Sequence, residues 1–380
     1  MEKTIKTEKL PIYSWAKEIE EGALKQAKNL ANLPVAYHHI AIMSDVHEGY
    51  GMPIGGVLAT KNAVVCNAVG VDIGCGMRTT RTTLKKGQVN EKIDEILHQI
   101  SRSIPTGFYH HKEAQESEIF NHPPASPIIE QEIEAAKKQL GTLGGGNHFM
   151  EILYDSEERI WLMVHSGSRN FGYKTAQYYH KKALAFHPEY KDLAWIETDR
   201  KIGREYFDAM NFCVEFARQN RNHMLSTIVE IVESYLDKFE HTMPLDIHHN
   251  FASLEEHFGK QVYVHRKGAT RAFEGEEGII PGSMGTPSYI AKGLGNELSF
   301  KSCSHGAGRR MSRKKAKKEF TIESLREELD NKGIKLVATH KAQALEEAPG
   351  AYKDIDEVIK KQNDLVEILY RLEPLGVVVG

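Results

Sequence analysis

The sequence contains no long apolar run and little cysteine, and both absences exclude classes of protein. No stretch of about 18 apolar residues occurs, so the pattern predicts no transmembrane helix. Residues 1–10 mix charged and polar side chains without an apolar segment, and no secretory signal is visible. The four cysteines are too few and too scattered for a disulfide framework. We therefore expect a cytoplasmic protein, in which a cysteine is available as a thiolate ligand.

The sequence also lacks a charge excess, a low-complexity linker and an internal repeat. Its 49 Lys and Arg nearly balance 52 Asp and Glu, and the net charge of −3 excludes a protein that coats nucleic acid by bulk charge. A local basic groove is compatible with this balance, because steering depends on where the charges lie. Hydrophobic residues make up 41% of the chain, which is enough for a sizeable core. We predict one interwoven α+β domain that spans residues 1–380.

Hydrophobic periodicity predicts three helices and several short strands. Apolar residues recur at helical spacing over 198–235 and 353–372, and the first segment is long enough for a kinked helix or two helices. A third helix is expected over 128–140, ending at Gly141. The predicted strands are 35–43, 57–60, 160–165, 262–265 and 377–379. The expected architecture is therefore mixed β-sheets with surrounding helices.

Glycine-rich loops carry most of the side chains that can perform chemistry. Asp72 and Cys75 lie three residues apart on a glycine-flanked turn, which can direct a carboxylate and a thiolate to one place. His148 follows a triple glycine, and His165 ends an apolar strand. Together with His249, these residues offer carboxylate, thiolate and imidazole donors, a set that suits zinc, iron or manganese.

The spacing of these donors matches no zinc finger and no HExxH helix. For each residue alone, a buried core cysteine or a structural histidine is the alternative interpretation. His305 lies between Ser304 and Gly306, in a loop that runs into basic residues. An imidazole in such a loop can act as a nucleophile or as an acid–base group near a phosphate.

Basic residues form two groups that can contact an anionic polymer. Residues 309–318 hold seven Lys or Arg in ten positions. A solvated helix face and a contact with RNA phosphates explain this run about equally well. Arg266, Lys267 and Arg271 form a second group, which can line a groove together with Arg169.

Taken together and in this order, the loops resemble the RtcB-type RNA ligase family, the tRNA-splicing and RNA-repair ligases. The matching segments are 45–49, 69–77, 141–149, 165–169, 249–250, 266–269, 278–285 and 302–313. Because several independent motifs occur in the same order over most of the chain, the resemblance is specific. It implies a single RtcB-like domain over residues 1–380 with a central metal-binding cleft.

The resemblance also implies a reaction and its cofactors. Two manganese ions are expected on Asp72, Cys75, His148, His165 and His249, with Cys75 able to bridge them. GTP is expected to be attacked by His305, which then carries a covalent guanylate. The GMP passes to an RNA 3′-phosphate, giving an RNA-3′-pp-G intermediate, and a 5′-hydroxyl displaces it. A 2′,3′-cyclic phosphate is first opened at the same site.

The substrate-binding residues follow by the same resemblance. The guanylate pocket is expected at Asn147, Glu151, Asn250, Pro281, Gly282, Ser283, Met284, Ser288, His305, Gly306, Ala307 and Gly308. The expected RNA contacts are Arg169, Arg266, Lys267 and Arg309. The partner is RNA with a 3′-phosphate or cyclic phosphate and a 5′-hydroxyl, in RNA repair or tRNA splicing. The resemblance does not specify whether an activating protein partner is required, which RNA is the physiological substrate, or what the oligomeric state is.

Two departures from the family pattern keep alternatives in view. The family usually ends in Lys-Gly, and that lysine helps to recognise guanine, whereas this chain ends Val378-Val379-Gly380. Ser44 and Tyr50 stand where relatives tend to carry proline and lysine. One alternative is therefore an RtcB-like paralogue with altered nucleotide use or a non-ligating, metal-dependent role in binding RNA ends. Another is a metallophosphoesterase that acts on RNA ends without joining them.

Overall fold

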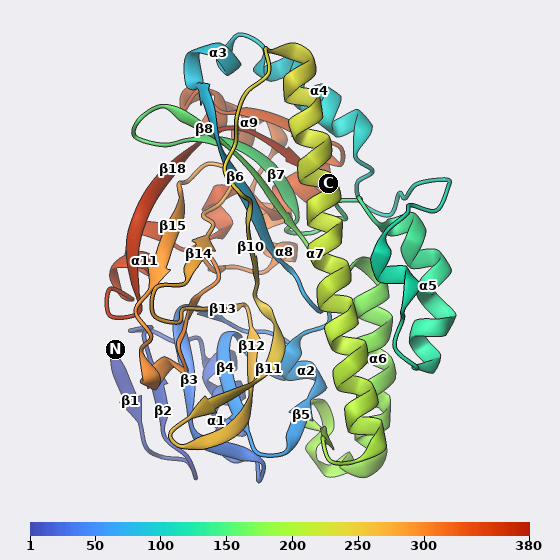
Figure 1. The fold of residues 1–380 in the computed structure, drawn as a ribbon. Coiled ribbons are helices and arrows are strands. Elements are labelled where there is room, and N and C mark those ends of the chain that lie inside the picture. The colour runs from blue at the N-terminus through green and yellow to red at the C-terminus, as the bar shows by residue number, and fades with distance from the viewer.

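Two β-sheets dominate the structure, a computed structural model that describes residues 1–380. The six-stranded sheet has the order β1-β2-β3-β4-β12-β11 and lies in the lower part of Figure 1. Its strands are β1 (Lys3–Ile5), β2 (Ile12–Ser14), β3 (Ala36–His47), β4 (Ile54–Thr60), β12 (Lys260–Lys267) and β11 (Asn250–His257). These strands come from residues 3–60 and 250–267, two segments far apart in the sequence, so the fold is interwoven.

The eight-stranded sheet lies above it in the same view, with the order β10-β6-β8-β7-β18-β15-β14 and with β17 paired to β18. Its strands are β6 (Gly76–Lys85), β7 (Phe149–Tyr154), β8 (Arg159–Ser166), β10 (Leu245–His248), β14 (Glu277–Ile280), β15 (Ser288–Gly293), β17 (Lys335–Ala338) and β18 (Val366–Val379). Two small ladders pair β5 (Ala63–Val65) with β9 (Trp195–Glu197) and β13 (Ala269–Arg271) with β16 (Ser302–Ser304).

Helices cover the outer faces of these sheets. The first seven are α1 (Glu21–Ala31), α2 (Cys66–Val69), α3 (Lys86–Asn90), α4 (Ile93–Ser103), α5 (Pro127–Gln139), α6 (Arg169–Phe186) and α7 (Lys201–Tyr235). The last four are α8 (Arg313–Glu319), α9 (Ile322–Asn331), α10 (Lys341–Glu346) and α11 (Ile355–Lys360). None of them is both long enough and apolar enough to cross a membrane. The predicted α+β class is confirmed.

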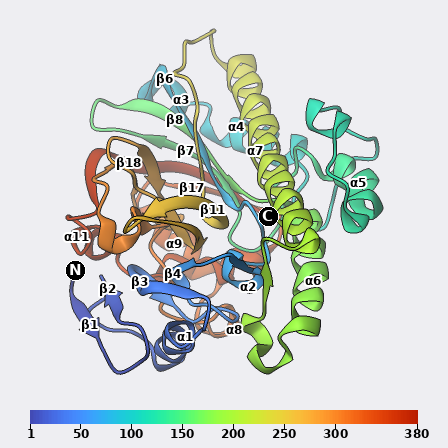
Figure 2. The ribbon, with the colours of Figure 1, turned by 60° about the horizontal axis from the view of Figure 1, so that its bottom comes forward.

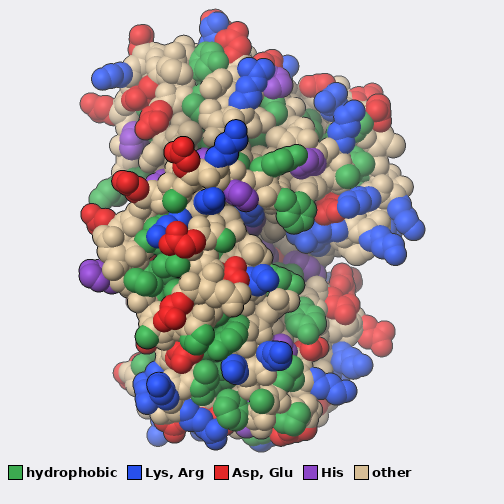
Figure 3. All heavy atoms as spheres, turned by 90° about the vertical axis from the view of Figure 1, so that its right-hand side faces the viewer, with side chains coloured by type: hydrophobic (Ala, Val, Ile, Leu, Met, Phe, Trp, Pro, Cys, Tyr) green, Lys and Arg blue, Asp and Glu red, His purple; other side chains and the backbone are tan.

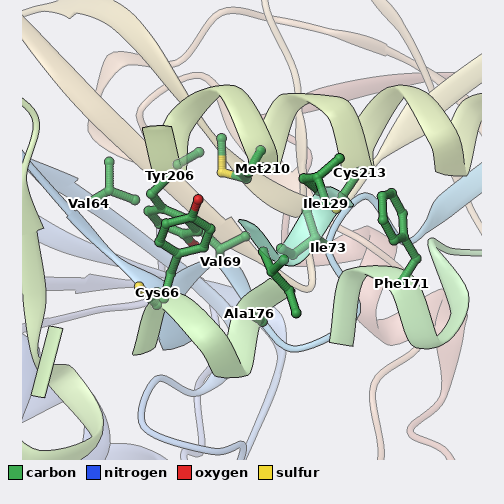
Figure 4. Packing of buried hydrophobic residues seen from close by; sticks show 14 of the residues in the cluster. Val64, Cys66, Val69, Ile73, Ile129, Phe171, Ala176, Tyr206, Met210 and Cys213 are labelled. Carbon is green, nitrogen blue, oxygen red and sulfur yellow. The ribbon is translucent and has the colours of Figure 1, made fainter. Parts of the chain in front are cut away.

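Helices α5, α6 and α7 form one flank of the molecule, and both ribbon views place them on the same side (Figures 1 and 2). Their apolar faces meet in a core that includes Phe171, Tyr206, Met210 and Phe216, part of which is shown in Figure 4. The other end of α7 packs with α4 on the eight-stranded sheet, where Ile228 and Val232 contact the strand core. The 35-residue α7 therefore connects the two layers as one continuous helix rather than the kinked or split helix considered above.

The prediction of a helix over 353–372 is wrong. Only Ile355–Lys360 is helical, and Val366–Val379 is a 14-residue strand. This strand pairs with β7 and β15 on its two sides and with β17 near its end, so most of its backbone groups are bonded within the sheet. The ladder shifts register between Pro374 and Gly376, which accommodates a proline that has no N–H to donate. Partners distant in sequence therefore outweigh a local helical pattern.

Candidate active site

Sheet topology brings four of the predicted metal ligands to one edge of the eight-stranded sheet. Neighbouring strands β10, β6, β8 and β7 are antiparallel, so the ends of β10 and β8 adjoin the starts of β6 and β7. Cys75 directly precedes β6, His148 precedes β7, His165 lies at the end of β8, and His249 follows β10. Asp72 joins them from the turn between α2 and β6.

The donor atoms of these five residues converge on one small volume. Cys75 Sγ lies 3.4 Å from Nε2 of both His148 and His165. Asp72 Oδ2 lies 3.1 Å from His148 Nε2, and His249 Nε2 lies 3.4 Å from His165 Nε2. Cys75, His148 and His165 are buried and form the tightest group, a set that can hold a metal ion. The Asp72 side chain is 28% exposed, so this group has an open side toward solvent.

Two of the histidines are oriented as metal ligands require. His148 Nδ1 lies 2.9 Å from the carbonyl oxygen of Leu143, and His165 Nδ1 lies 2.8 Å from that of Asn147. A carbonyl only accepts, so each Nδ1 carries the proton and each Nε2 directs a lone pair at the cluster. Burial holds the pKa of His165 well below its ordinary value, which keeps this imidazole neutral. The donor set therefore fits a borderline divalent metal such as manganese or zinc.

The Cys75 thiol adds a second argument for a cation. Burial, reinforced by the negative charge of Asp72, raises the pKa of this thiol well above its ordinary value. A bound divalent cation reverses that balance, because its charge favours the thiolate. A thiol facing two lone pairs and a carboxylate is poorly matched without a cation, so these residue types make chemical sense as a ligand group.

His305 lies at the border between the two sheets and is fixed by Asp45. Its Nδ1 is 2.6 Å from Asp45 Oδ2, and its backbone N–H donates to the same oxygen at 3.2 Å. Asp45 is fully buried in β3. Since the carboxylate accepts the Nδ1 proton, Nε2 is left as the free nitrogen of the ring. The ring centroid lies 4.9 Å from that of His249, so the nucleophile candidate adjoins the metal-capable group.

Asp45 is a functional candidate that the sequence interpretation missed as an individual residue. It was noticed only within a matching segment, although an acid inside the apolar run Ile40–Val46 is a signal in itself. A buried carboxylate needs a hydrogen-bonding partner, and a histidine from a distant loop supplies it here.

A cavity of about 360 Å³ opens beside His305. Its lining includes predicted pocket residues, namely Asn147, Pro281, Gly282, His305, Gly306, Ala307 and Gly308. A smaller adjoining pocket includes Ser283, Met284 and Val379. Phe149 and Tyr352 line both, and neither was predicted. The cavity therefore gathers most of the predicted nucleotide residues next to the nucleophile candidate.

Two other predicted pocket residues support loops instead of lining the cavity. The Asn250 side-chain N–H donates to the carbonyl of Asp72 at 3.1 Å, and its Oδ1 accepts from Gly268 N at 3.0 Å. Ser288 Oγ accepts from the backbone N–H of Gly282 at 3.2 Å. Asn250 thus holds the turn that contains Asp72 in place, and Ser288 holds the Pro281–Met284 turn.

Glu151 lies two residues beyond Phe149 on β7, so both side chains leave the strand on the same face. Its side chain is buried, and burial alone raises its pKa to about 8, since no charged or hydrogen-bonding neighbour contributes. A carboxyl of this kind is available to a ligand that brings its own donors.

The four predicted RNA contacts fall into two pairs. Arg266 is fully buried and paired with Glu255 at 2.6 Å, and buried Lys267 donates to the backbone carbonyls of Tyr50 and Asn67. Neither side chain presents its charge at the surface, so both support the framework in this structure.

Arg169 and Arg309 do lie at the site. The Arg169 guanidinium donates to Gly107 O at 2.7 Å and crosses over Gly144, where an added Cβ would lie 1.9 Å from it. Gly144 also has φ +90°, so a glycine is required there. Arg309 lines the cavity and pairs with Glu347 at 3.1 Å. The basic run that follows splits, with Arg313 at the cavity and four lysines exposed on α8, namely Lys314, Lys315, Lys317 and Lys318.

A buried thiol–imidazole group beside a histidine at a nucleotide-sized cavity is the arrangement of a metal-dependent enzyme. Residues 26–122 and 109–380 match the family model described as tRNA-splicing ligase RtcB. The chain is 39% identical to RNA-splicing ligase RtcB of Escherichia coli K12 over 98% of both chains. It is 32% identical to tRNA-splicing ligase RtcB of Thermococcus kodakarensis, over 95% of this chain and 92% of that protein.

The chain therefore belongs to the RtcB family of RNA-splicing ligases, and the predictions of the family and of an RNA ligase are confirmed.

Proposed function

We propose that this enzyme uses GTP and two manganese ions to join RNA 3′-phosphate or 2′,3′-cyclic-phosphate ends to 5′-hydroxyl ends. The observation that carries the proposal is the position of His305, bonded through Nδ1 to Asp45 and facing a cavity beside the metal-capable group. RNA repair and tRNA splicing both use this end chemistry, and the proposal covers both.

The first step fits the geometry of His305. Its Nε2 attacks the α-phosphorus of GTP, an N–P bond forms, and the bond to pyrophosphate breaks. Asp45 holds the ring and its Nδ1 proton, so the positive charge that develops on the imidazole is stabilised. An oxygen of the RNA 3′-phosphate then takes the GMP, and Nε2 regains its lone pair.

The second step joins the strands. A phosphate monoester is a poor electrophile, and its link to GMP supplies a leaving group. The 5′-hydroxyl attacks the RNA phosphorus, the bond to GMP breaks, and the hydroxyl proton passes to solvent or to the departing phosphate. A cyclic phosphate is first opened by water. Arg169 and Arg309, which lie at the metal group and the cavity, are proposed to hold RNA phosphates.

The metal ligands are proposed to be Asp72, Cys75, His148, His165 and His249. Cys75 Sγ lies 3.4 Å from both imidazole nitrogens, so a thiolate there would share a bound cation with His148 and His165. When bound, the metal ions neutralise phosphate charge and polarise the phosphorus under attack. Leu143 and Asn147 keep the ligand nitrogens deprotonated through their carbonyls.

A gel assay tests the proposal directly. One RNA with a labelled 3′-terminal phosphate is incubated with a 5′-hydroxyl RNA, manganese and GTP. We expect a joined product in which the label has become resistant to phosphatase. Loss of the label without joining and without a nucleotide requirement would indicate a metallophosphoesterase. RNA binding without either reaction would indicate a non-ligating paralogue.

The same assay, run with GTP or ATP, tests base selection at Val379. This side chain is buried and lines the smaller pocket together with Phe149, Tyr352 and Glu347. A valine offers no hydrogen bond, whereas Val379→Lys places an ammonium group near the Glu347 carboxylate. We expect the substitution to raise the preference for GTP over ATP by about tenfold. This factor corresponds to about 1.4 kcal/mol, close to the contribution of one hydrogen bond from a charged group to the base. Val379→Ile is the matched control, and an unchanged GTP/ATP ratio in Val379→Lys would exclude a role in base selection.

A prediction on pH follows from Glu151, whose pKa rises to about 8 on folding from an ordinary value near 4.5. The folded protein thus binds the Glu151 proton more tightly than the unfolded chain. The stabilisation is complete below about pH 4.5 and is lost as pH rises through 8. Without nucleotide, Glu151→Gln is expected to be more stable than the original protein at pH 8.5, on the order of 2–4 kcal/mol, and close to it at pH 5.

Melting temperatures at the two pH values check this prediction. Exposed Glu157→Gln is the control, and it should shift the melting temperature equally at both. If the Glu151→Gln shift is also equal at both, Glu151 is charged in the folded state. We further expect the Gln variant to bind GTP at least tenfold more weakly, because a carboxylate accepts from the guanine N1–H and amino group more strongly than an amide.

A further inference from the structure

The loop 105–112 exposes two aromatic side chains next to the metal-capable group. Phe108 is 98% exposed and Tyr109 is 68% exposed, more than any other aromatic residue of the chain. Exposed apolar side chains are ordinary one at a time, but two adjacent aromatic side chains that are both mostly exposed require a reason. Figure 3 shows the flank that holds α5, α6 and α7, where hydrophobic, His and Lys or Arg side chains surround a hollow with further His inside.

The backbone of this loop is tied to the loop that carries His148. Gly107 N donates to Gly144 O at 2.8 Å, and Leu143 N donates to Pro105 O at 2.9 Å. His148 bonds the carbonyl of the same Leu143. The backbone that carries the two exposed rings therefore has a defined position relative to His148.

Arg169 fastens the loop from the other side. Its guanidinium donates to Gly107 O at 2.7 Å and to Thr142 Oγ1 at 3.0 Å. Its backbone has φ +60°, a left-handed conformation that costs about 1 kcal/mol or more for a non-glycine residue. The surrounding structure maintains this strained residue where it connects the aromatic loop to the metal loop.

One of the two rings, that of Tyr109, already stacks on another side chain. Tyr109 lies nearly parallel to the imidazole of His340, with an interplanar angle of 13° and centroids 6.3 Å apart. Thr106 and Thr339 join the two segments through their hydroxyls at 2.9 Å. A flat aromatic surface thus combines side chains from two distant parts of the sequence.

The charges around this surface favour an anion. Exposed Lys112, Lys138 and Lys341 outnumber the one exposed acid that adjoins segments 104–112 and 338–345, Glu113, and Glu346 is paired with Lys317. His111 N donates to Lys138 O, so the end of the loop that carries Lys112 lies next to α5. Flat rings interleaved with lysines are the features of a surface that binds single-stranded nucleic acid.

We propose that Phe108 and Tyr109, with His340, form a stacking platform for bases of single-stranded RNA close to the end that is joined. The inference rests on the proposed function, because it takes the RNA at the metal group as the substrate. Bases of any sequence stack on such rings, and the lysines attract the strand, so the platform serves positioning without sequence preference.

The test measures binding of RNA that carries the fluorescent base 2-aminopurine. The base is placed in the first nucleotides of the 3′-phosphate strand in one series and of the 5′-hydroxyl strand in another. With the original protein, stacking is expected to quench the fluorescence in at least one series. Phe108→Ala/Tyr109→Ala is expected to remove this quenching and to weaken RNA binding by roughly 5- to 150-fold per lost stacked base.

Two further variants separate stacking from other causes. Phe108→Trp/Tyr109→Trp should restore quenching, and Phe108→Leu/Tyr109→Leu should not, since leucine is apolar but has no ring. Phe186→Ala removes an exposed aromatic residue about 25 Å along α6 from Arg169 and should leave RNA binding unchanged. Unchanged RNA affinity and quenching in the double alanine variant would overturn the proposal. The exposed rings would then be assigned to a contact with a protein partner.

Failure of the platform and failure of the proposed function give different results. If the platform idea is wrong, the original protein joins RNA and the double alanine variant does so with the same KM. If the ligase chemistry is wrong, the original protein forms no joined product and no guanylate on His305. In the expected case the double alanine variant forms the His305 guanylate at the normal rate, and only the KM for RNA rises.

Discussion

Replacing His305 with alanine is expected to abolish the covalent guanylate and RNA joining together. Among the histidines that line the cavity, His305 is the one whose Nδ1 is held by the Asp45 carboxylate, which leaves its Nε2 free. Removal of a covalent nucleophile typically lowers the rate by 10⁴-fold or more. The measurement is transfer of label from α-labelled GTP to the protein in the presence of manganese. His122→Ala, at an exposed histidine outside the site, is the control. Persistent labelling of His305→Ala would place the nucleophile elsewhere.

Asp45→Asn sharpens this prediction, because it preserves the shape of the side chain but removes the carboxylate charge and adds an N–H donor. An asparagine amide can donate to His305 Nδ1, which would move the imidazole proton to Nε2 and block attack. We expect guanylation to slow by about 10²- to 10⁴-fold, by analogy with other histidines oriented by a carboxylate. Manganese and GTP affinities should stay within a fewfold of the original. Equal loss of affinity and rate would instead show a general disturbance of the fold.

The second large effect is expected at Cys75. Its Sγ lies at the centre of the ligand group, so Cys75→Ala removes the atom that contacts both imidazoles. We expect manganese affinity to fall by about 100-fold or more, since even loss of residues behind the ligands typically costs 10- to 100-fold, and joining to be lost with it. Binding is measured by electron paramagnetic resonance of free manganese, with the bound stoichiometry as the second readout.

A matched control makes the Cys75 result specific. Cys213 is also fully buried, but it lies in the α6–α7 core and bonds Thr175 rather than the ligand group. Cys213→Ala should lower the melting temperature slightly and leave the manganese stoichiometry unchanged. For Cys75→Ala we expect the opposite pattern, a retained melting temperature without metal and a reduced stoichiometry. Normal manganese binding in Cys75→Ala would remove this residue from the ligand set.

Most of the site prediction came from the order of the motifs along the sequence. Asp72, Cys75, His148, His165 and His249 are spread over 178 positions, and spacing alone gave no metal pattern. The residue types on glycine-rich loops marked them as donors, and the resemblance grouped them. The sequence could not show that Arg266 and Lys267 are buried, because a basic residue at a strand end has the same local pattern whether it faces RNA or a carbonyl. Only the three-dimensional structure shows that Arg266 pairs with Glu255 inside the protein.

The same limit explains the wrong helix over 353–372. Ile355, Val358 and Leu365 have helical spacing, yet the backbone of β18 is bonded to β7, β15 and β17 from three other parts of the chain. Local periodicity records which side chains are buried and not what they are buried against. This strand places Val379 in the smaller pocket beside Phe149 and Tyr352, so the position of Val379 also depends on the sheet.

The sequence by itself determined the class of protein and the chemical types in its site. Composition, the absence of apolar runs and the ordered motifs were sufficient for an α+β RNA ligase with thiolate, carboxylate and imidazole donors. Only the tertiary structure decided which groups meet: Cys75 between two imidazoles, Asp45 against His305, and the loop of Phe108 and Tyr109 beside the loop that carries His148. The physical reason is that orientation, tautomer and burial arise from contacts between residues far apart in sequence, and local pattern does not specify those contacts.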